Sequence, residues 1–164
     1  MEFVLESDSS KKTQEYGKEF SKLFKGGEIL LLDGPLGGGK TTFVKGVMAG
    51  LGYSGRVLSP SFTISRLYKA EKYDVCHVDL YRLEAGDIFD TGIGADFYDK
   101  NVIYIIEWGQ KLKEELSEYI EVKFEFLGEE NRRLTFSMSD FCLKKFSRLI
   151  KKVLVSRHKT RSKK

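Results

Sequence analysis

The sequence has no long hydrophobic run and few cysteines, and each shortage excludes a class of protein. No stretch approaches the roughly 20 consecutive apolar residues that a membrane-spanning helix needs, and residues 1–6 lack the basic-then-apolar pattern of a secretion signal. Cys76 and Cys142 are far apart and form no Cys-x-x-Cys pair, so neither a disulfide framework nor a zinc site is expected. We therefore expect a cytoplasmic protein that does not contact a membrane.

Acidic residues are missing from the end of the chain. Residues 144–164 contain ten Lys or Arg and no Asp or Glu, which leaves 18 basic against 24 acidic residues in the first 143, a net charge of −6 there. A basic tail of this kind either binds nucleic acid or an acidic partner, or only solubilises the terminus. The sequence leaves both readings open.

The bulk composition describes one soluble globular protein. The chain has 164 residues, of which 41% are hydrophobic and 32% charged, enough for a substantial core. No internal repeat or interior linker is present. We expect a single domain over residues 1–155, followed by a disordered basic tail over residues 156–164.

The most informative segment, Gly34–Thr41, reads Gly-Pro-Leu-Gly-Gly-Gly-Lys-Thr and fits the phosphate-loop pattern G-x-x-x-x-G-K-T. It follows the apolar run Ile29–Leu32 and precedes apolar residues at helical spacing, as this motif requires. Glycines let backbone N–H groups turn around a phosphate, and the helix N-terminus points at the same place. Lys40 can reach the β- and γ-phosphates, and the Thr41 hydroxyl can ligate Mg²⁺. The segment predicts a site for a nucleoside triphosphate and Mg²⁺.

Hydrophobic patterning predicts an α/β fold like that of P-loop NTPases. We expect a central, mostly parallel sheet flanked by helices, then a C-terminal antiparallel hairpin and a basic C-terminal helix. The expected strands are 3–6, 28–33, 62–68, 73–80, 101–106, 119–127 and 132–138. The expected helices are 10–24, 40–51, 111–116 and 141–155, with short helical pieces over 84–98.

Two acidic residues follow strand-like runs and supply the second half of a hydrolytic site. Glu107 ends the run 102–106, and Asp79 ends the run 75–78. Ligands of open α/β sheets bind at the carboxyl ends of the strands, where both side chains would meet. Either carboxylate could hold Mg²⁺ through its water shell while the other orients the attacking water. The sequence does not decide between these assignments.

Four motifs in this order resemble the bacterial TsaE (YjeE) family: Leu36–Thr42, Ser59–Thr63, His77–Arg82 and Ile106–Trp108. The resemblance covers residues 9–133. It implies an ATPase required for forming threonylcarbamoyladenosine on tRNAs that read codons starting with A. It also implies weak ATP hydrolysis by the protein alone and stimulation by the partner proteins TsaB and TsaD.

The resemblance also implies roles for individual residues. Lys40, Asp79 and Glu107 would be catalytic, and Thr41 and Glu107 would lie at Mg²⁺. The segment Ser59–Thr63 would act as a nucleotide-sensing switch, made of Ser59, Pro60, Ser61, Phe62 and Thr63. Residues expected at the nucleotide are Thr13, Gly37, Gly38, Gly39, Lys40, Thr41, Thr42, Trp108 and Arg132.

The remaining motif residues have less specific expectations. Gly38 stands where the family usually has Ala, and Ser61 where it usually has Thr; both changes preserve the chemistry. His77 is expected to be a structural histidine near a strand end. Tyr81 and Arg82 are expected to form a patch that faces a partner.

Three other functions share the phosphate loop. A small-molecule kinase usually needs an Arg-rich lid, but residues 84–98, where a lid would sit, contain no Arg. A GTPase would need a guanine-reading N-K-x-D motif, which the chain lacks. A binding module that only changes shape with nucleotide stays open, because intrinsic turnover distinguishes it from an ATPase.

Overall fold

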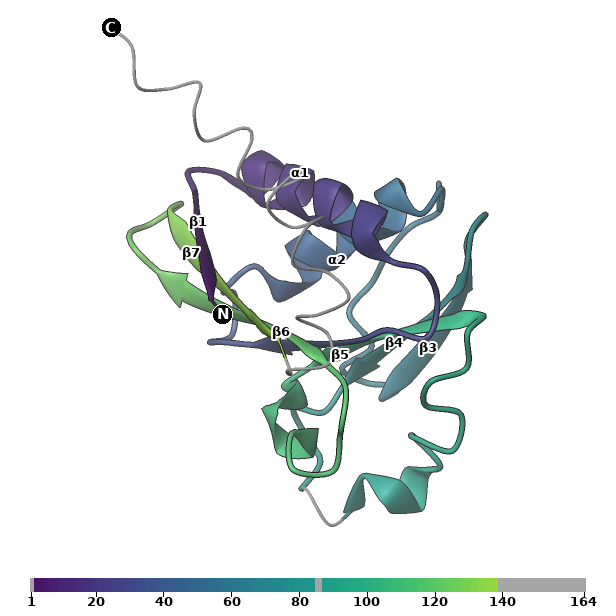
Figure 1. Ribbon diagram of the computed structural model, residues 1–164. Coiled ribbons are helices and arrows are strands. Elements are labelled where there is room, and N and C mark those ends of the chain that lie inside the picture. Colours follow the sequence, from purple (N-terminus) through teal and green to yellow (C-terminus); the bar gives the residue numbers. More distant parts are fainter. Residues whose placement is uncertain (1, 85–86, 139–164) are drawn as a thin grey trace, which may run out of the picture.

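The structure, a computed structural model, describes residues 2–84 and 87–138 (Figure 1). Within these residues, seven strands form one sheet in the order β1-β7-β6-β2-β5-β4-β3. Their bounds are β1 Phe3–Ser7, β2 Ile29–Asp33, β3 Ser65–Lys69, β4 Asp74–Asp79, β5 Val102–Glu107, β6 Ile120–Phe126 and β7 Arg132–Met138. All seven overlap segments that the hydrophobic pattern predicts as strands, and β1, β3 and β5 each end one residue later than predicted.

The sheet is parallel only in its centre. Strands β6, β2, β5 and β4 run parallel to one another, whereas β1 with β7, β7 with β6, and β3 with β4 pair antiparallel. The expectation of a mostly parallel sheet therefore holds for the central strands and not for the edges. Short turns join β3 to β4 and β6 to β7, and a short turn can join only antiparallel strands.

The two α-helices of the described residues cover the same face of the sheet. Helix α1 (Ser10–Phe20) is capped by Ser9, whose side chain accepts a hydrogen bond from Lys12 N, and continues into the 3₁₀ helix η1 (Ser21–Leu23). Helix α2 (Lys40–Gly50) follows the phosphate loop. A Cβ placed on Gly46 of α2 would lie 2.0 Å from the carbonyl oxygen of Gln14. Glycine therefore permits the close packing of the two helices seen in Figure 1.

The two faces of the sheet have separate apolar cores. On the helix face, Phe20 and Phe43 pack against the strands with Phe124 and Phe136, and all four side chains are fully buried. On the opposite face, Leu31 and Ile106 contact the connecting segments around the 3₁₀ helices η3 (Phe89–Thr91) and η4 (Gly109–Leu112). Figure 1 shows these segments below the sheet. No α-helix covers this face in the described part of the chain.

Two predicted elements begin two or three residues away from their predicted starts. The helix predicted over 111–116 is the shorter η4, which begins two residues earlier. The strand predicted from residue 62 begins at Ser65, because Thr63 N closes a turn on the Pro60 carbonyl and Ile64 has a left-handed backbone, with φ 64°. A β-branched residue in this region is strained and cannot continue a strand.

Strand alternation directs the predicted acids to one side. Val75 of β4 and Ile105 of β5 belong to the core on the helix face. Successive side chains point to opposite faces, so Asp79, four residues after Val75, and Glu107, two residues after Ile105, share that face. The two acids are register partners. They therefore lie together at the carboxyl edge of the sheet, next to the start of α2.

Some expectations concern residues outside the described ranges. The predicted basic helix over 141–155 and the tail over 156–164 lie there, so both stay predictions. Among the described residues, the structure contains no helix with the length and apolar character needed to span a membrane.

Candidate nucleotide-binding site

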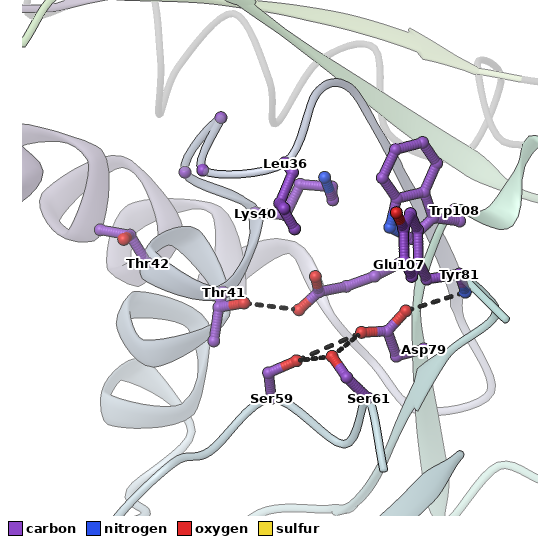
Figure 2. Close-up of a pocket in the computed structure, with 13 residues that line it drawn as sticks. Leu36, Lys40, Thr41, Thr42, Ser59, Ser61, Asp79, Tyr81, Glu107 and Trp108 are labelled. Atoms are coloured by element: carbon purple, nitrogen blue, oxygen red, sulfur yellow. Dashed lines mark hydrogen bonds between the residues drawn. The ribbon is translucent and has the colours of Figure 1, made fainter. Parts of the chain in front are cut away.

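A pocket of about 340 Å³ opens at the carboxyl edge of β2, β4 and β5, where α2 begins (Figure 2). It is formed by the phosphate loop, the start of α2, part of the segment 59–63 and the ends of β4 and β5. Its lining residues are Leu36, Gly37, Gly38, Gly39, Lys40, Thr41, Thr42, Ser59, Ser61, Asp79, Tyr81, Glu107 and Trp108.

The phosphate loop has a backbone that glycine makes possible. Gly39 precedes α2 with φ 105°, a left-handed conformation that other residues rarely adopt. A Cβ on Gly38 would lie 2.8 Å from the Pro35 carbonyl oxygen, the same atom that accepts a hydrogen bond from Gly38 N. The loop thus turns tightly and leaves its glycines along the pocket wall, where the N–H groups of Gly37 and Gly39 can approach an anion.

Lys40 lies buried at the floor of the pocket. Its ammonium donates to the Gly34 carbonyl at 2.6 Å and to the Pro35 carbonyl at 3.0 Å, and lies 4.4 Å from the centre of the Trp108 ring. Burial lowers the pKa of Lys40, an effect that the charges of Glu107, Asp79 and Asp33 partly oppose. The Lys40 ammonium has therefore lost hydration through burial, and an anionic ligand in the pocket would compensate for that loss.

Glu107 connects the sheet to the phosphate loop. Its Oε1 accepts a hydrogen bond from the Thr41 hydroxyl at 2.9 Å and lies 2.9 Å from His77 Nε2. The carboxylate is almost fully buried yet lines the pocket. Two oxygen groups, one carboxylate and one hydroxyl, therefore converge at one point, and such groups are ligands that Mg²⁺ prefers.

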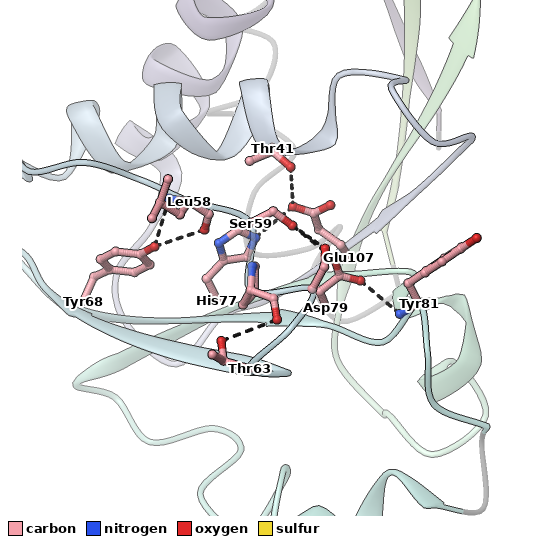
Figure 3. A network of polar contacts seen from close by, with 11 residues as sticks. Thr41, Leu58, Ser59, Thr63, Tyr68, His77, Asp79, Tyr81 and Glu107 are labelled. Atoms are coloured by element: carbon pink, nitrogen blue, oxygen red, sulfur yellow. Dashed lines mark hydrogen bonds and ion pairs between the residues drawn. The ribbon is translucent and has the colours of Figure 1, made fainter.

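Asp79 holds the segment 59–63 against the strand (Figure 3). Its Oδ2 accepts from the Ser61 hydroxyl at 2.5 Å and from the Ser59 hydroxyl at 3.2 Å, while its Oδ1 accepts from Tyr81 N at 3.0 Å. Because the donors come from segments on both sides, the position of the carboxylate depends on where the segment 59–61 lies.

The predicted switch segment lies only partly in the pocket. Ser59 and Ser61 line it, whereas Pro60, Phe62 and Thr63 do not. Pro60 is buried, and Phe62 is 85% exposed with the Arg82 guanidinium 4.7 Å from its ring centre. The segment thus has a polar side facing the pocket and an aromatic side facing outward.

Trp108 lies across the pocket from Thr41 (Figure 2). It has a left-handed backbone, with φ 60°, and its N–H donates to the Leu32 carbonyl at 2.8 Å. Its ring contacts Tyr81, with 5.1 Å between ring centres. Backbone strain of this kind is common where a side chain has to be held in a binding site.

The structure brings most of the residues predicted at the nucleotide together, but two of them do not line the pocket. The buried Thr13 hydroxyl is bonded to Ser7 Oγ and to the Ser9 carbonyl. Arg132 is half-buried and donates to carbonyls of its own turn, including that of Glu129. Their contact with nucleotide stays a prediction.

Sequence reasoning did not place three residues in the site: Leu36 and Tyr81, which line the pocket, and His77, which contacts Glu107. Leu36 lies within the phosphate-loop motif but is not fixed by its pattern. His77 precedes Asp79 by two residues, so strand alternation could have placed it on the same face.

Comparison with known proteins assigns the chain to a family. The family model described as "Threonylcarbamoyl adenosine biosynthesis protein TsaE" matches residues 7–134. The chain belongs to the TsaE family. This confirms the resemblance seen in the motifs, and the match includes every residue that lines the pocket.

Individual TsaE proteins match over most of their length. The Treponema pallidum protein named "tRNA threonylcarbamoyladenosine biosynthesis protein TsaE" is 36% identical over 131 residues, covering 79% of this chain and 96% of that protein. A Bacillus subtilis protein of the same name is 35% identical, covering 76% and 78%. The crystal structure of Bacillus subtilis YdiB superposes with a TM-score of 0.75 at 27% identity, covering 98% of this chain and 97% of that one.

Proposed function

We propose that this TsaE-family protein is a Mg²⁺-dependent ATPase that acts in the threonylcarbamoyladenosine modification of tRNAs reading codons that start with A. The names of its relatives support the pathway. One observation carries the ATPase assignment: Lys40 and Thr41 at the start of α2, Asp79 at the end of β4 and Glu107 at the end of β5 line a single pocket.

The residues fit the phosphates of ATP. The N–H groups of Gly37 and Gly39 and the N-terminus of α2 supply a partly positive wall, and Lys40 supplies a full charge. Lys40 is held by carbonyl oxygens, which are weaker partners for an ammonium than phosphate oxygens are. ATP binding would therefore give this buried cation better partners, with Thr42 and Trp108 as further contacts in the pocket.

The residues also fit Mg²⁺. The Thr41 hydroxyl lies 2.9 Å from Oε1 of Glu107, so the hydroxyl and the Glu107 carboxylate are close enough to serve one ion directly or through its water shell. Bound at this point, Mg²⁺ would neutralise charge on the phosphate oxygens during hydrolysis. Two protein oxygens are enough, because Mg²⁺ usually keeps several waters and takes other ligands from the substrate.

Hydrolysis needs a water placed in line with the terminal phosphorus. Attack of this water forms a new P–O bond and breaks the bond between the γ-phosphorus and the bridging oxygen, giving ADP and inorganic phosphate. Asp79 and Glu107 are the two carboxylates that could orient the water and accept its proton. Lys40 and the loop N–H groups would stabilise the charge on the leaving ADP.

The segment 59–63 would couple the nucleotide to a partner. Ser59 and Ser61 face the pocket, where they can respond to the γ-phosphate, while Phe62 and Arg82 face outward. Contacts to the γ-phosphate exist only in the triphosphate state, so they can favour one arrangement of the segment. In our proposal this arrangement of the segment docks the TsaB–TsaD transferase pair. Hydrolysis of ATP then ends the arrangement and resets the pair.

Two further parts of the proposal concern the surroundings of the protein. The basic residues after Arg148 would contact tRNA directly, or tRNA would be reached only through the transferase pair. Deleting residues 156–164 tests this point, because direct contact predicts the loss of a salt-sensitive affinity for tRNA. The expected location is the cytoplasm, where tRNA is available.

The deciding experiment measures ATP turnover by the purified protein with Mg²⁺, alone and with the TsaB–TsaD pair and tRNA. We expect slow hydrolysis alone and clear stimulation by the pair. Binding of ATP with no turnover under any condition would favour a nucleotide-switched binding module instead. Transfer of the γ-phosphate to a small molecule rather than to water would favour a kinase.

A further inference from the structure

We propose that His77 positions the Glu107 carboxylate, holding one of its oxygens so that the other stays directed into the pocket. This inference rests on the proposed function, because it concerns the carboxylate expected at Mg²⁺. His77 would not touch nucleotide itself; it would act through Glu107.

The contact is direct and comes from a neighbouring strand. His77 lies on β4, which pairs in parallel with β5, the strand that ends in Glu107. Its Nε2 is 2.9 Å from Glu107 Oε1, a hydrogen-bond distance, and Figure 3 shows the ring beside the carboxylate. Both side chains are buried, so water does not compete strongly for this bond.

The geometry also indicates which nitrogen carries the hydrogen. Nδ1 of His77 is buried and has no hydrogen-bond partner among the described residues. An unpaired buried N–H is rarer in proteins than an unpaired acceptor, so the hydrogen belongs on Nε2, where the carboxylate accepts it. His77 therefore acts as a donor with one defined direction.

The arrangement leaves one oxygen of the Glu107 carboxylate available to a ligand in the pocket. The hydrogen bonds to Glu107 from His77 and Thr41 both go to Oε1. Figure 2 shows the other oxygen, Oε2, on the side of Lys40. Of the two donors, Thr41 belongs to the phosphate-binding segment, whereas His77 is fixed in the sheet. His77 can therefore hold the carboxylate in the same orientation whatever the loop binds.

Partners that orient a metal-binding carboxylate have measurable effects. Removing such a partner commonly costs about 10- to 100-fold in metal affinity or activity. A purely structural histidine would instead change stability and leave the response to Mg²⁺ unaltered. Two substitutions separate these cases: His77→Gln keeps an N–H donor near the position of Nε2, and His77→Leu fills the core without a donor.

The test compares wild type, His77→Gln, His77→Leu and the control Val75→Ala in Mg²⁺ titrations. Val75 lies on the same strand and face, is fully buried and does not line the pocket. Two quantities are followed: the ATP-dependent rise in melting temperature and ATP turnover. We expect His77→Leu to need about 10- to 100-fold more Mg²⁺ than wild type to reach half of the full rise in melting temperature and half of the full turnover. In EDTA it should bind ATP as wild type does. His77→Gln should return close to wild type, and Val75→Ala should lower the melting temperature only.

The outcomes distinguish this inference from the proposed function. Wild type that shows no Mg²⁺-dependent ATP binding or turnover overturns the proposed function and this inference with it. A normal wild type together with an unshifted His77→Leu titration overturns only the inference, as does an equal shift in Val75→Ala.

A second measurement applies even if His77→Leu does not fold. The chain has two histidines, so ¹⁵N-histidine spectra of wild type and of His158→Gln identify the signals of His77. We expect a proton on Nε2 and none on Nδ1, and a change in these signals in Glu107→Ala. A proton on Nδ1 with none on Nε2 would contradict the proposed hydrogen bond.

Discussion

Asp79 and Glu107 are register partners at the ends of β4 and β5, yet their carboxylates contact different parts of the site. Glu107 accepts a hydrogen bond from Thr41 at the start of α2, whereas Asp79 accepts hydrogen bonds from Ser59 and Ser61. The acid at the end of β5 therefore contacts the phosphate-binding helix, and the acid at the end of the neighbouring strand β4 contacts the predicted switch segment. Substituting each acid should have a different principal effect.

Replacing Glu107 should mainly remove Mg²⁺-dependent hydrolysis. Glu107→Ala deletes the carboxylate expected at Mg²⁺ but leaves Lys40 and the loop N–H groups, so some nucleotide should still bind. Loss of one electrostatic stabiliser typically costs about 3 kcal/mol, a hundredfold or more in rate. Turnover and calorimetric ATP binding should be measured side by side, with the exposed Glu114→Ala as control. Turnover within a few-fold of wild type would contradict the assignment of Glu107.

Replacing Asp79 should mainly loosen the segment 59–63. Hydrogen bonds to a charged group contribute about 1.5–3 kcal/mol each, and Asp79→Ala removes those from Ser59, Ser61 and Tyr81 N together. We expect the backbone amides of residues 59 and 61–63 to exchange with deuterium about tenfold faster or more, and ATP turnover to fall.

A double-mutant cycle tests whether the Ser61 contact carries this effect. If Asp79 acts on the segment through Ser61, the combined Ser61→Ala and Asp79→Ala variant should exchange no faster than Asp79→Ala alone. Strictly additive effects would place the action of Asp79 elsewhere.

Local pattern was sufficient to predict the parts of the site that one segment defines. The phosphate loop follows from its glycines, and the placement of Asp79 and Glu107 follows from two apolar runs that each end in an acid. Because parallel strands end at the same edge of a sheet, two such acids are expected to meet. The antiparallel hairpin over β6 and β7 was predicted from alternation and a turn for similar reasons.

Contacts between distant segments were not predictable from local pattern. The bond between His77 and Glu107 joins residues 30 apart in sequence, and that between Ser61 and Asp79 joins residues 18 apart. Each depends on strand order, which the hydrophobic pattern does not specify. The left-handed Ile64 shows the same limit, because its backbone is imposed by the surrounding contacts against its own preference.

Lys40 should be needed for binding but not for folding. Burial lowers its pKa, so the unfolded chain binds the Lys40 proton more tightly than the folded protein does. Between the lowered pKa and the ordinary value of 10.5, the unfolded state holds more protons, and stability contributed by this group rises with pH. At neutral pH the charged side chain therefore costs stability, which a neutral side chain of similar length would not.

Lys40→Met tests this separation. We expect a melting temperature without nucleotide at least equal to that of wild type. The rise in melting temperature that ATP produces should be lost; in wild type it reflects about 2.7 kcal/mol of added stability at a ligand concentration of 100 Kd. Lys45→Met, which changes an exposed lysine of the same helix, should keep the full ATP response. A strongly destabilised Lys40→Met would show that the ammonium is a structural part of the loop.

Trp108 should report nucleotide binding by its fluorescence. It is the single tryptophan of the chain, and the Lys40 ammonium lies 4.4 Å from its ring centre. If ATP draws Lys40 toward its phosphates, the charge next to the indole changes, and the emission maximum or intensity should change with the same ATP dependence as calorimetric binding. Trp108→Phe removes the signal and identifies its source. In Lys40→Met the emission should no longer respond to ATP, whereas a full response there would mean that the indole senses the nucleotide without Lys40.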